Sequence, residues 1–168
     1  MPGMRDKDTG ISDGVHPPIR SIRDALSFRI ARMAAINERA GGIYFQTELG
    51  LRLNEWRVLG LVAASGTAAF SDIRDQLLID KGQLSRVVRT LVDRGLLESR
   101  PSETDARQIT LALTADGRAL HDRAIGFTAE RNDSMVSVLS AAECRQLHDM
   151  LDRLIRHNEQ LLAQKEGK

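Results

Sequence analysis

The stretch from Asp80 to Gly95 limits the fold of this chain more than any other, because it describes one complete amphipathic helix. Asp80 has the side chain of a helix N-cap, and Gln83 follows three residues later, as in a capping box. Gly95 is the expected end of the helix. The apolar positions between them repeat at the spacing of one helical face, at Leu84, Val87, Val88, Leu91 and Val92.

Beyond Gly95 the apolar period falls to about two residues, which is typical of strands. One strand is predicted over residues 96–100. The alternation of large apolar residues with Thr110 and Ala112 over residues 109–113 predicts a second, half-buried strand. Turn-forming residues occupy 101–106. The sequence therefore predicts a hairpin of two strands directly after the amphipathic helix.

Two further helices are predicted upstream of Asp80. Asn54 is a candidate N-cap for a helix that ends at Ser65-Gly66, and residues 71–78 predict a shorter helix. Helix, short helix, capped helix and hairpin in this order predict a winged helix-turn-helix, in a mainly α fold with a small β-hairpin wing.

The polar face of the helix after Asp80 carries side chains that suit DNA. A recognition helix presents one face to the major groove, where Gln pairs with adenine and Arg with guanine. The candidate contacts are Gln83, Arg86 and Arg89, and the small side chain of Ser85 permits close approach to the DNA. An amphipathic helix with Arg on one side is usually only a solvated surface helix. The hairpin that follows, with Arg107 in its turn, nevertheless favours DNA binding.

Helical segments flank this central region. A helix is expected from about Ile19, with Gly41-Gly42 ending or bending it, and Thr114 can cap a long helix to about Leu139. Ser140 begins a second capping box, which opens the last helix. We expect four parts: a flexible arm (1–18), an N-terminal helical dimerisation segment (19–50), the winged helix-turn-helix (51–113) and a C-terminal helical dimerisation segment (114–168).

The last helix carries an apolar stripe in steps of three and four residues. It comprises Cys144, Leu147, Leu151, Leu154, Asn158 and Leu161. This heptad spacing on a terminal helix favours a two-fold interface in a homodimer, although the stripe could instead pack only within the monomer. Asn158 is a candidate for fixing the register of such an interface, and the alternative for this position is a simply solvated side chain.

Composition excludes several classes of protein. The formal net charge of the 168 residues is +1, so any affinity for nucleic acid must come from local clusters of Lys and Arg. One cysteine and four scattered histidines give no disulfide and no metal-ligand spacing. Neither a signal peptide nor an apolar run of membrane-spanning length is found, so we expect a cytoplasmic protein without a membrane partner. The absence of catalytic and cofactor motifs predicts no enzyme, no metal and no cofactor.

Five segments together resemble the MarR family of bacterial regulators. They are Trp56-Arg57-Val58-Leu59, Asp80-Lys81-Gly82-Gln83-Leu84-Ser85-Arg86, Leu91-Val92-Asp93-Arg94-Gly95-Leu96-Leu97, Asp105-Ala106-Arg107 and Leu111-Ala112-Leu113-Thr114-Ala115-Asp116-Gly117. The resemblance implies a homodimeric transcriptional repressor that binds a pseudo-palindromic operator in double-stranded DNA. It implies base or phosphate contacts from Lys81, Ser85, Arg86 and Arg89. It also implies that Arg107 enters the minor groove at the wing tip, and that Asp105 orients nearby arginines. Asp105 is alternatively only a turn residue that bonds its own backbone.

The resemblance further implies an effector, because members of the family often release DNA when a small aromatic or phenolic acid binds. The candidate lining residues are Phe28, Arg32, Met33, Trp56, Arg57 and Phe127. Ordinary core packing is the stronger alternative for each apolar residue, and Arg32 and Arg57 are equally well explained as surface charges.

Two other hypotheses stay open. One is a winged-helix protein-interaction module without DNA binding, which would need no basic recognition face. The other is a redox switch at Cys144, although a free cysteine on an apolar stripe is normally an inert small hydrophobe.

Overall fold

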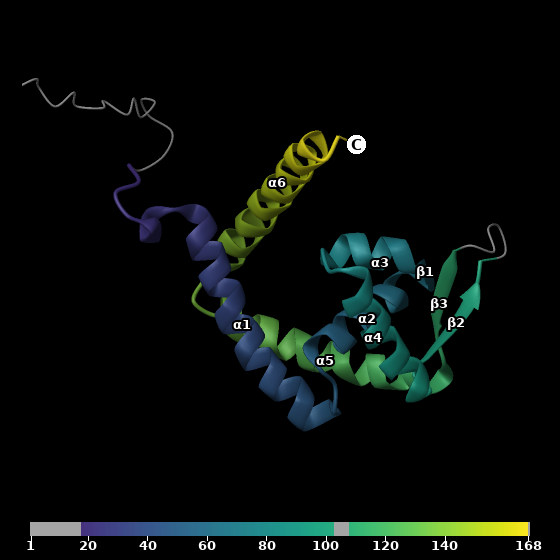
Figure 1. The fold of residues 1–168 in the computed structure, drawn as a ribbon. Helices are drawn as coiled ribbons and strands as arrows, with labels where there is room; N and C mark the ends of the chain where they lie inside the picture. The colour runs from purple at the N-terminus through teal and green to yellow at the C-terminus, as the bar shows by residue number, and fades with distance from the viewer. Residues whose placement is uncertain (1–17, 103–107, 168) are drawn as a thin grey trace, which may run out of the picture. The chain divides into compact units, whose positions relative to one another are not determined.

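The computed structural model describes residues 18–102 and 108–167, and within them the chain is mainly helical with one small antiparallel sheet (Figure 1). The chain consists of two compact units, Met1–Arg57 and Val58–Lys168. The predicted fold class, mainly α with a small β wing, is confirmed. The predicted N-terminal arm lies outside the described residues except for Pro18.

The first unit contains a short 3-10 helix, η1 (Ile22–Asp24), and the long helix α1 (Leu26–Leu49). Of the two alternatives expected at Gly41-Gly42, an end or a bend of the helix, the end is wrong, because α1 continues through both glycines to Leu49. The buried side chains of Phe45 and Leu49 follow the glycines, and their burial offsets the roughly 1 kcal/mol that each helical glycine costs. Gly50, with a φ of 61°, terminates α1 instead.

Helix α2 (Leu53–Ser65) begins one residue before the predicted N-cap, so Asn54 lies within its first turn. A carboxylate oxygen of Glu55 accepts from the backbone N–H of Arg52 at 2.9 Å and stabilises the start of the helix. Asn54 Oδ1 instead accepts from Nη1 of Arg57 at 3.1 Å.

The second unit contains the two helices of the helix-turn-helix, α3 (Phe70–Leu77) and α4 (Lys81–Asp93). Asp80 caps α4, since its Oδ1 accepts from the backbone N–H of Gln83 at 2.8 Å. At the other end Gly95 has a φ of 68°, and the N–H of Leu96 donates to the carbonyl of Leu91 at 2.9 Å. Leu91 and Leu96 are both buried, as in a Schellman motif with its hydrophobic contact.

The sheet has three antiparallel strands in the order β1-β3-β2. The predicted hairpin is formed by β2 (Leu97–Pro101) and β3 (Ile109–Leu113). Strand β1 (Thr67–Ala69) was not predicted, because three residues are too few to show an alternation. The largest fully buried side chains of this unit are Val58, Leu59, Val62, Ile73, Leu84, Leu91 and Leu111.

Two long helices complete the chain, α5 (Ala115–Val136) and α6 (Ala141–Lys165), both with the predicted caps. Thr114 Oγ1 accepts from the N–H of Gly117 at 2.9 Å. At the start of α6, the hydroxyl of Ser140 donates to Glu143 Oε2 at 2.7 Å, and its backbone N–H donates to the same oxygen at 2.8 Å. These two hydrogen bonds lower the pKa of the Glu143 carboxyl.

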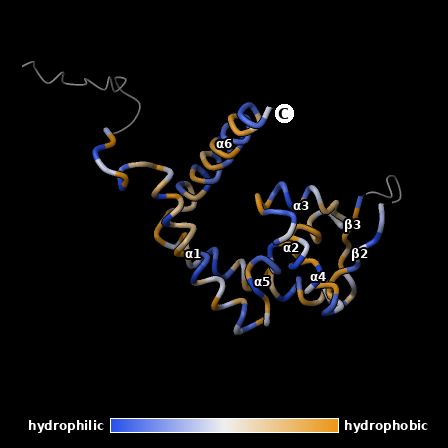
Figure 2. Tube along the Cα trace, in the orientation of Figure 1, coloured by the Kyte–Doolittle hydropathy of each residue, from blue (hydrophilic) through white to orange (hydrophobic). Residues whose placement is uncertain are grey.

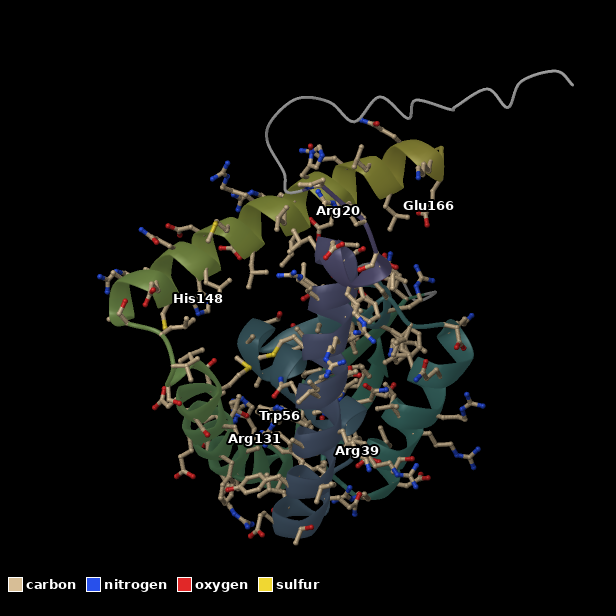
Figure 3. All side chains as sticks on the ribbon, turned by 90° about the vertical axis from the view of Figure 1, so that its left-hand side faces the viewer. Arg20, Arg39, Trp56, Arg131, His148 and Glu166 are labelled. Carbon is tan, nitrogen blue, oxygen red and sulfur yellow. The ribbon has the colours of Figure 1, made fainter. Side chains whose placement is uncertain are left out.

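The apolar residues of α6 remain largely uncovered. No residue of α6 is buried, and hydrophobic and hydrophilic positions alternate along it (Figure 2). Side chains project around the whole helix, with His148 and Glu166 toward its two ends (Figure 3). The side-chain amide of Asn158 forms a hydrogen bond within its own helix, because its Nδ2 donates to the carbonyl of Leu154 at 2.8 Å. The exposed large hydrophobic residues of α6 are Leu147, Met150, Leu154, Ile155, Leu161 and Leu162.

Candidate nucleic-acid interface

Helix α4 has two faces of opposite character. Its apolar face is buried at Leu84, Val88 and Leu91, and this burial packs the helix against the rest of the second unit. The predicted DNA contacts on the opposite face are exposed, except for Gln83, which is half-buried. The exposed ones are Lys81, Ser85, Arg86 and Arg89. A rigid helix with an anchored apolar side and an open basic side matches what major-groove recognition requires.

The positive charge of Arg89 on this open face is only weakly neutralised by a neighbouring carboxylate. Arg89 Nε lies 3.8 Å from Asp93 Oδ2, and their side chains are 84% and 68% exposed. An exposed pair at this distance contributes little to stability, so a phosphate or a guanine can replace Asp93 easily. Thr90 lies on the same face, and its hydroxyl already donates to the carbonyl of Arg86 at 3.0 Å, so only its acceptor capacity is left for DNA.

The wing is built from β2 and β3, which pair up to Pro101 and Ile109. The N–H of Ser102 donates to the carbonyl of Gln108 at 2.8 Å and closes the base of the connecting loop. Asp105 and Arg107, the predicted wing residues, lie outside the described residues. Their assignment therefore stays a prediction.

A close contact at the base of the wing was missed by the sequence analysis. Thr114 Oγ1 donates to the carbonyl of Gly95 at 2.7 Å, and the N–H of Thr114 donates to the carbonyl of Leu96 at 3.3 Å. A Cβ atom at Gly117 would lie only 2.0 Å from the carbonyl oxygen of Leu96. The start of α5 is thus clamped to the end of α4, and the Leu-Thr-x-x-Gly pattern of the sequence is the signal for this clamp.

Two adjoining hollows, of about 280 and 240 Å³, lie along the side of α4 that faces the wing. They share Phe70, Ser85 and Ile109, and we refer to them together as the α4–wing trough. The first is also lined by Val88, Arg89, Val92 and Ser99, and the second by Ser71, Arg74, Lys81 and Gln108. The trough therefore combines an apolar floor with basic and hydroxyl groups.

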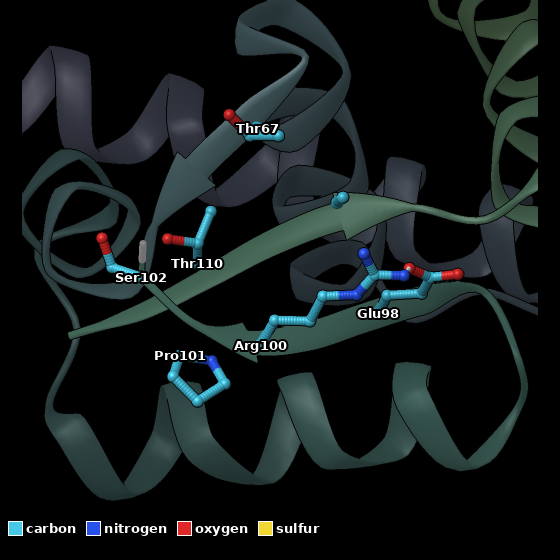
Figure 4. A pocket seen from close by; sticks show the side chains of 7 residues that line it. Thr67, Glu98, Arg100, Pro101, Ser102 and Thr110 are labelled. Atoms are coloured by element: carbon cyan, nitrogen blue, oxygen red, sulfur yellow. Dashed lines mark hydrogen bonds and ion pairs between the residues drawn. The ribbon is translucent and has the colours of Figure 1, made fainter. Parts of the chain in front are cut away.

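A third hollow, of about 390 Å³, lies on the sheet and is lined by residues of all three strands (Figure 4). Its charged residues are Glu98 and Arg100, which are paired with each other. The hydroxyl groups of Thr67, Ser102 and Thr110 also line it. Because the Glu98 carboxylate itself lines this hollow, whereas none of the residues that line the α4–wing trough is acidic, this hollow is less suited to an anionic partner than the trough.

Two effector candidates have partners within the first unit. Trp56 is buried and stacks on Phe45, with ring centroids 5.5 Å apart. Arg57 Nη2 lies 2.7 Å from Glu38 Oε1, so its charge is already paired with a carboxylate. An acidic effector at Arg57 would have to displace Glu38.

The other effector candidates are distributed over both units. Arg32 and Met33 are exposed on α1, and Phe28 on the same helix is half-buried. Phe127 lies on α5 in the second unit and is half-buried. Cys144 is half-buried at the start of α6.

Within residues 18–102 and 108–167, no three His, Cys, Asp or Glu side chains gather so that they could hold a metal ion. None of the helices in the described part of the chain is long and apolar enough to cross a bilayer.

Comparisons with known proteins agree with this geometry. A family model described as MarR family matches residues 49–108. MhqR of Bacillus subtilis, an HTH-type transcriptional regulator, is 32% identical over 105 residues, which cover 62% of this chain and 72% of MhqR.

Solved structures share the fold. A mutant of E. coli MarR complexed with operator DNA has a TM-score of 0.68 at 21% identity, covering 77% of this chain and 92% of that chain. Bordetella bronchiseptica BpsR, whose DNA binding is regulated by 6-hydroxynicotinic acid, has a TM-score of 0.69 at 23% identity, covering 80% of this chain and 95% of that chain.

The fold, the basic face of α4 and the wing define a winged-helix transcriptional regulator, and not an enzyme. The chain belongs to the MarR family.

Proposed function

We propose that the chain is a dimeric repressor that inserts α4 into the major groove of a pseudo-palindromic operator in double-stranded DNA. The observation that carries this proposal is the division of α4 into a buried apolar face and an exposed face with Lys81, Arg86 and Arg89. The operator complex of the E. coli relative supports double-stranded DNA as the partner. A protein-interaction module without DNA binding would not require these three cations.

The proposed dimer uses the two helical segments at 19–50 and 114–168. Large hydrophobic side chains are exposed along α6, and a second exposed series on α1 comprises Leu26, Ile30, Met33, Ile36 and Ile43. A second copy of this chain is the favoured partner for these exposed apolar residues, because a two-fold DNA site requires two α4 helices on one face of the duplex. Burying these half-exposed side chains would contribute about 1 kcal/mol for each of them.

We further propose that a small aromatic acid weakens DNA binding. Support comes from BpsR and from Arg57, which lies beside the buried Trp56 and already binds a carboxylate, that of Glu38. In this proposal the acid replaces Glu38 at Arg57. Adding 6-hydroxynicotinic acid should then weaken operator binding by the wild-type protein but not by Arg57→Gln. Equal weakening of both proteins would rule out Arg57 as the contact.

The DNA proposal is tested by selecting bound duplexes from a random pool, followed by fluorescence anisotropy with the enriched duplex at several salt concentrations. Binding should weaken steeply as salt rises, because phosphate contacts release counterions. Arg86→Ala should cost about 1–3 kcal/mol of binding free energy and reduce discrimination against a scrambled duplex. Arg118→Ala, on the exposed surface of α5, is the matched control. Failure to enrich any duplex would favour the protein-interaction module.

A further inference from the structure

We propose that the α4–wing trough holds the DNA strand that separates the major groove from the minor groove, and that Arg74 of α3 binds a backbone phosphate there. This inference rests on the proposed function. It adds a contact outside the recognition helix, from a residue that the sequence analysis did not select.

The first argument is topological. When α4 enters the major groove and a wing enters the adjacent minor groove, one sugar-phosphate strand must pass between them. The trough lies at this position, because one of its walls is α4, with Lys81 and Ser85, and the opposite wall is β3 and its approach, with Ile109 and Gln108.

The second argument is chemical. A DNA backbone unit combines an anionic phosphate with a largely apolar deoxyribose. The trough offers both complements: the ammonium of Lys81 and the guanidinium of Arg74 for the phosphate, and Phe70 and Ile109 as an apolar surface for the sugar. The hydroxyls of Ser71 and Ser85 and the amide of Gln108 add neutral hydrogen-bonding groups. Backbone contacts of this kind position a protein on DNA without reading its sequence.

The third argument concerns the acidic residues nearby. Asp75 Oδ1 accepts from Nε and Nη2 of Arg74 at 2.9 and 2.7 Å, and Asp72 Oδ1 accepts from the Ser71 hydroxyl at 3.2 Å. Both acceptors are exposed and belong to α3 itself. Asp75 therefore fixes one edge of the guanidinium, while Nη1 at its other edge carries further N–H donors for a phosphate oxygen.

The test compares Arg74→Gln with Arg118→Gln, which removes the same charge from an exposed residue of α5 that does not line the trough. Each full-length protein is titrated against the selected duplex and a scrambled duplex at several salt concentrations. Arg74→Gln should weaken binding to both duplexes by about tenfold and make the slope of log K against log salt shallower by about 1 for each subunit bound. Arg74→Lys should restore most of the slope, since it restores the charge. Thermal melting verifies that each variant is folded.

The outcomes separate this inference from the proposed function. If the wild-type protein binds no duplex, the proposed function fails. If the wild type binds with a steep salt dependence but Arg74→Gln behaves like Arg118→Gln, only the trough assignment fails. A loss confined to the selected duplex would also overturn it, because Arg74 would then read bases.

Discussion

The winged-helix core and helix α6 contain similar apolar residues but use them differently. In the core, Leu59, Ile73 and Leu111 are fully buried. In α6 a regular apolar stripe is present, yet the helix has no buried residue. The difference teaches that helical periodicity predicts an apolar face but not the partner that covers it. The core should therefore respond to changes in internal packing, whereas α6 should respond to changes in assembly.

The largest expected effect is in the core, at the contact between the start of α5 and the end of α4. Gly117→Ala would place a Cβ atom 2.0 Å from the carbonyl oxygen of Leu96, and this is a backbone atom that cannot move aside by a rotamer change. We expect a loss of about 3 kcal/mol in the free energy of unfolding. Urea unfolding monitored by the fluorescence of Trp56 and by circular dichroism measures it.

The control for this variant is Gly126→Ala on the same helix. A Cβ atom at Gly126 meets nothing within 4 Å, so the substitution should stabilise the helix by about 0.5–1 kcal/mol. Equal effects at the two glycines would contradict the clamp.

The next effect is expected in α6 and should depend on protein concentration. Leu154→Glu puts a carboxylate on the apolar stripe, where the proposed second copy packs. Dimerisation should weaken by about 2 kcal/mol or more, because an apolar contact is lost and a charge is desolvated. Sedimentation velocity over a range of concentrations measures the dissociation constant.

Gln146→Glu introduces the same carboxylate at an exposed position beside the stripe and should leave the dimer intact. If Leu154→Glu also left the association unchanged, the stripe would not be the interface.

A smaller effect is expected at the helix caps, where the two regions can be compared directly. Asp80→Ala removes the acceptor for the N–H of Gln83 and should lower the free energy of unfolding by about 1 kcal/mol. Ser140→Ala removes the corresponding group from α6 and returns the pKa of Glu143 toward its ordinary value. Hydrogen exchange should show faster exchange throughout α4 in the first variant but only at the start of α6 in the second. Global destabilisation by Ser140→Ala would show that α6 unfolds together with the core.

These comparisons also show what could be predicted from sequence. The limits of α4, its cap at Asp80 and the two wing strands were predictable, because local side chains and alternation determine them. Strand β1, by contrast, exists only through pairing with β3, and its three residues carry no periodic signal of their own. Arg74 was overlooked for a similar reason, since the trough brings α3, α4 and β3 together from separate parts of the sequence.

The smallest expected effect is at Leu78, in the turn between α3 and α4. Its φ is 51°, in the left-handed region, and its side chain is 78% exposed, so the residue combines backbone strain with little burial. Leu78→Gly relieves the strain but increases the entropy of the unfolded chain, so the net gain should be only about 0.5 kcal/mol. Leu77→Gly, one residue earlier and half-buried within α3, should instead destabilise the protein, because it adds a glycine to a helix and removes an apolar contact. Opposite signs at these neighbouring leucines, measured by urea unfolding, would show that local backbone conformation, and not hydrophobicity, limits stability at this turn. A clear loss of stability in Leu78→Gly would mean that the exposed leucine has a cover, such as a second chain.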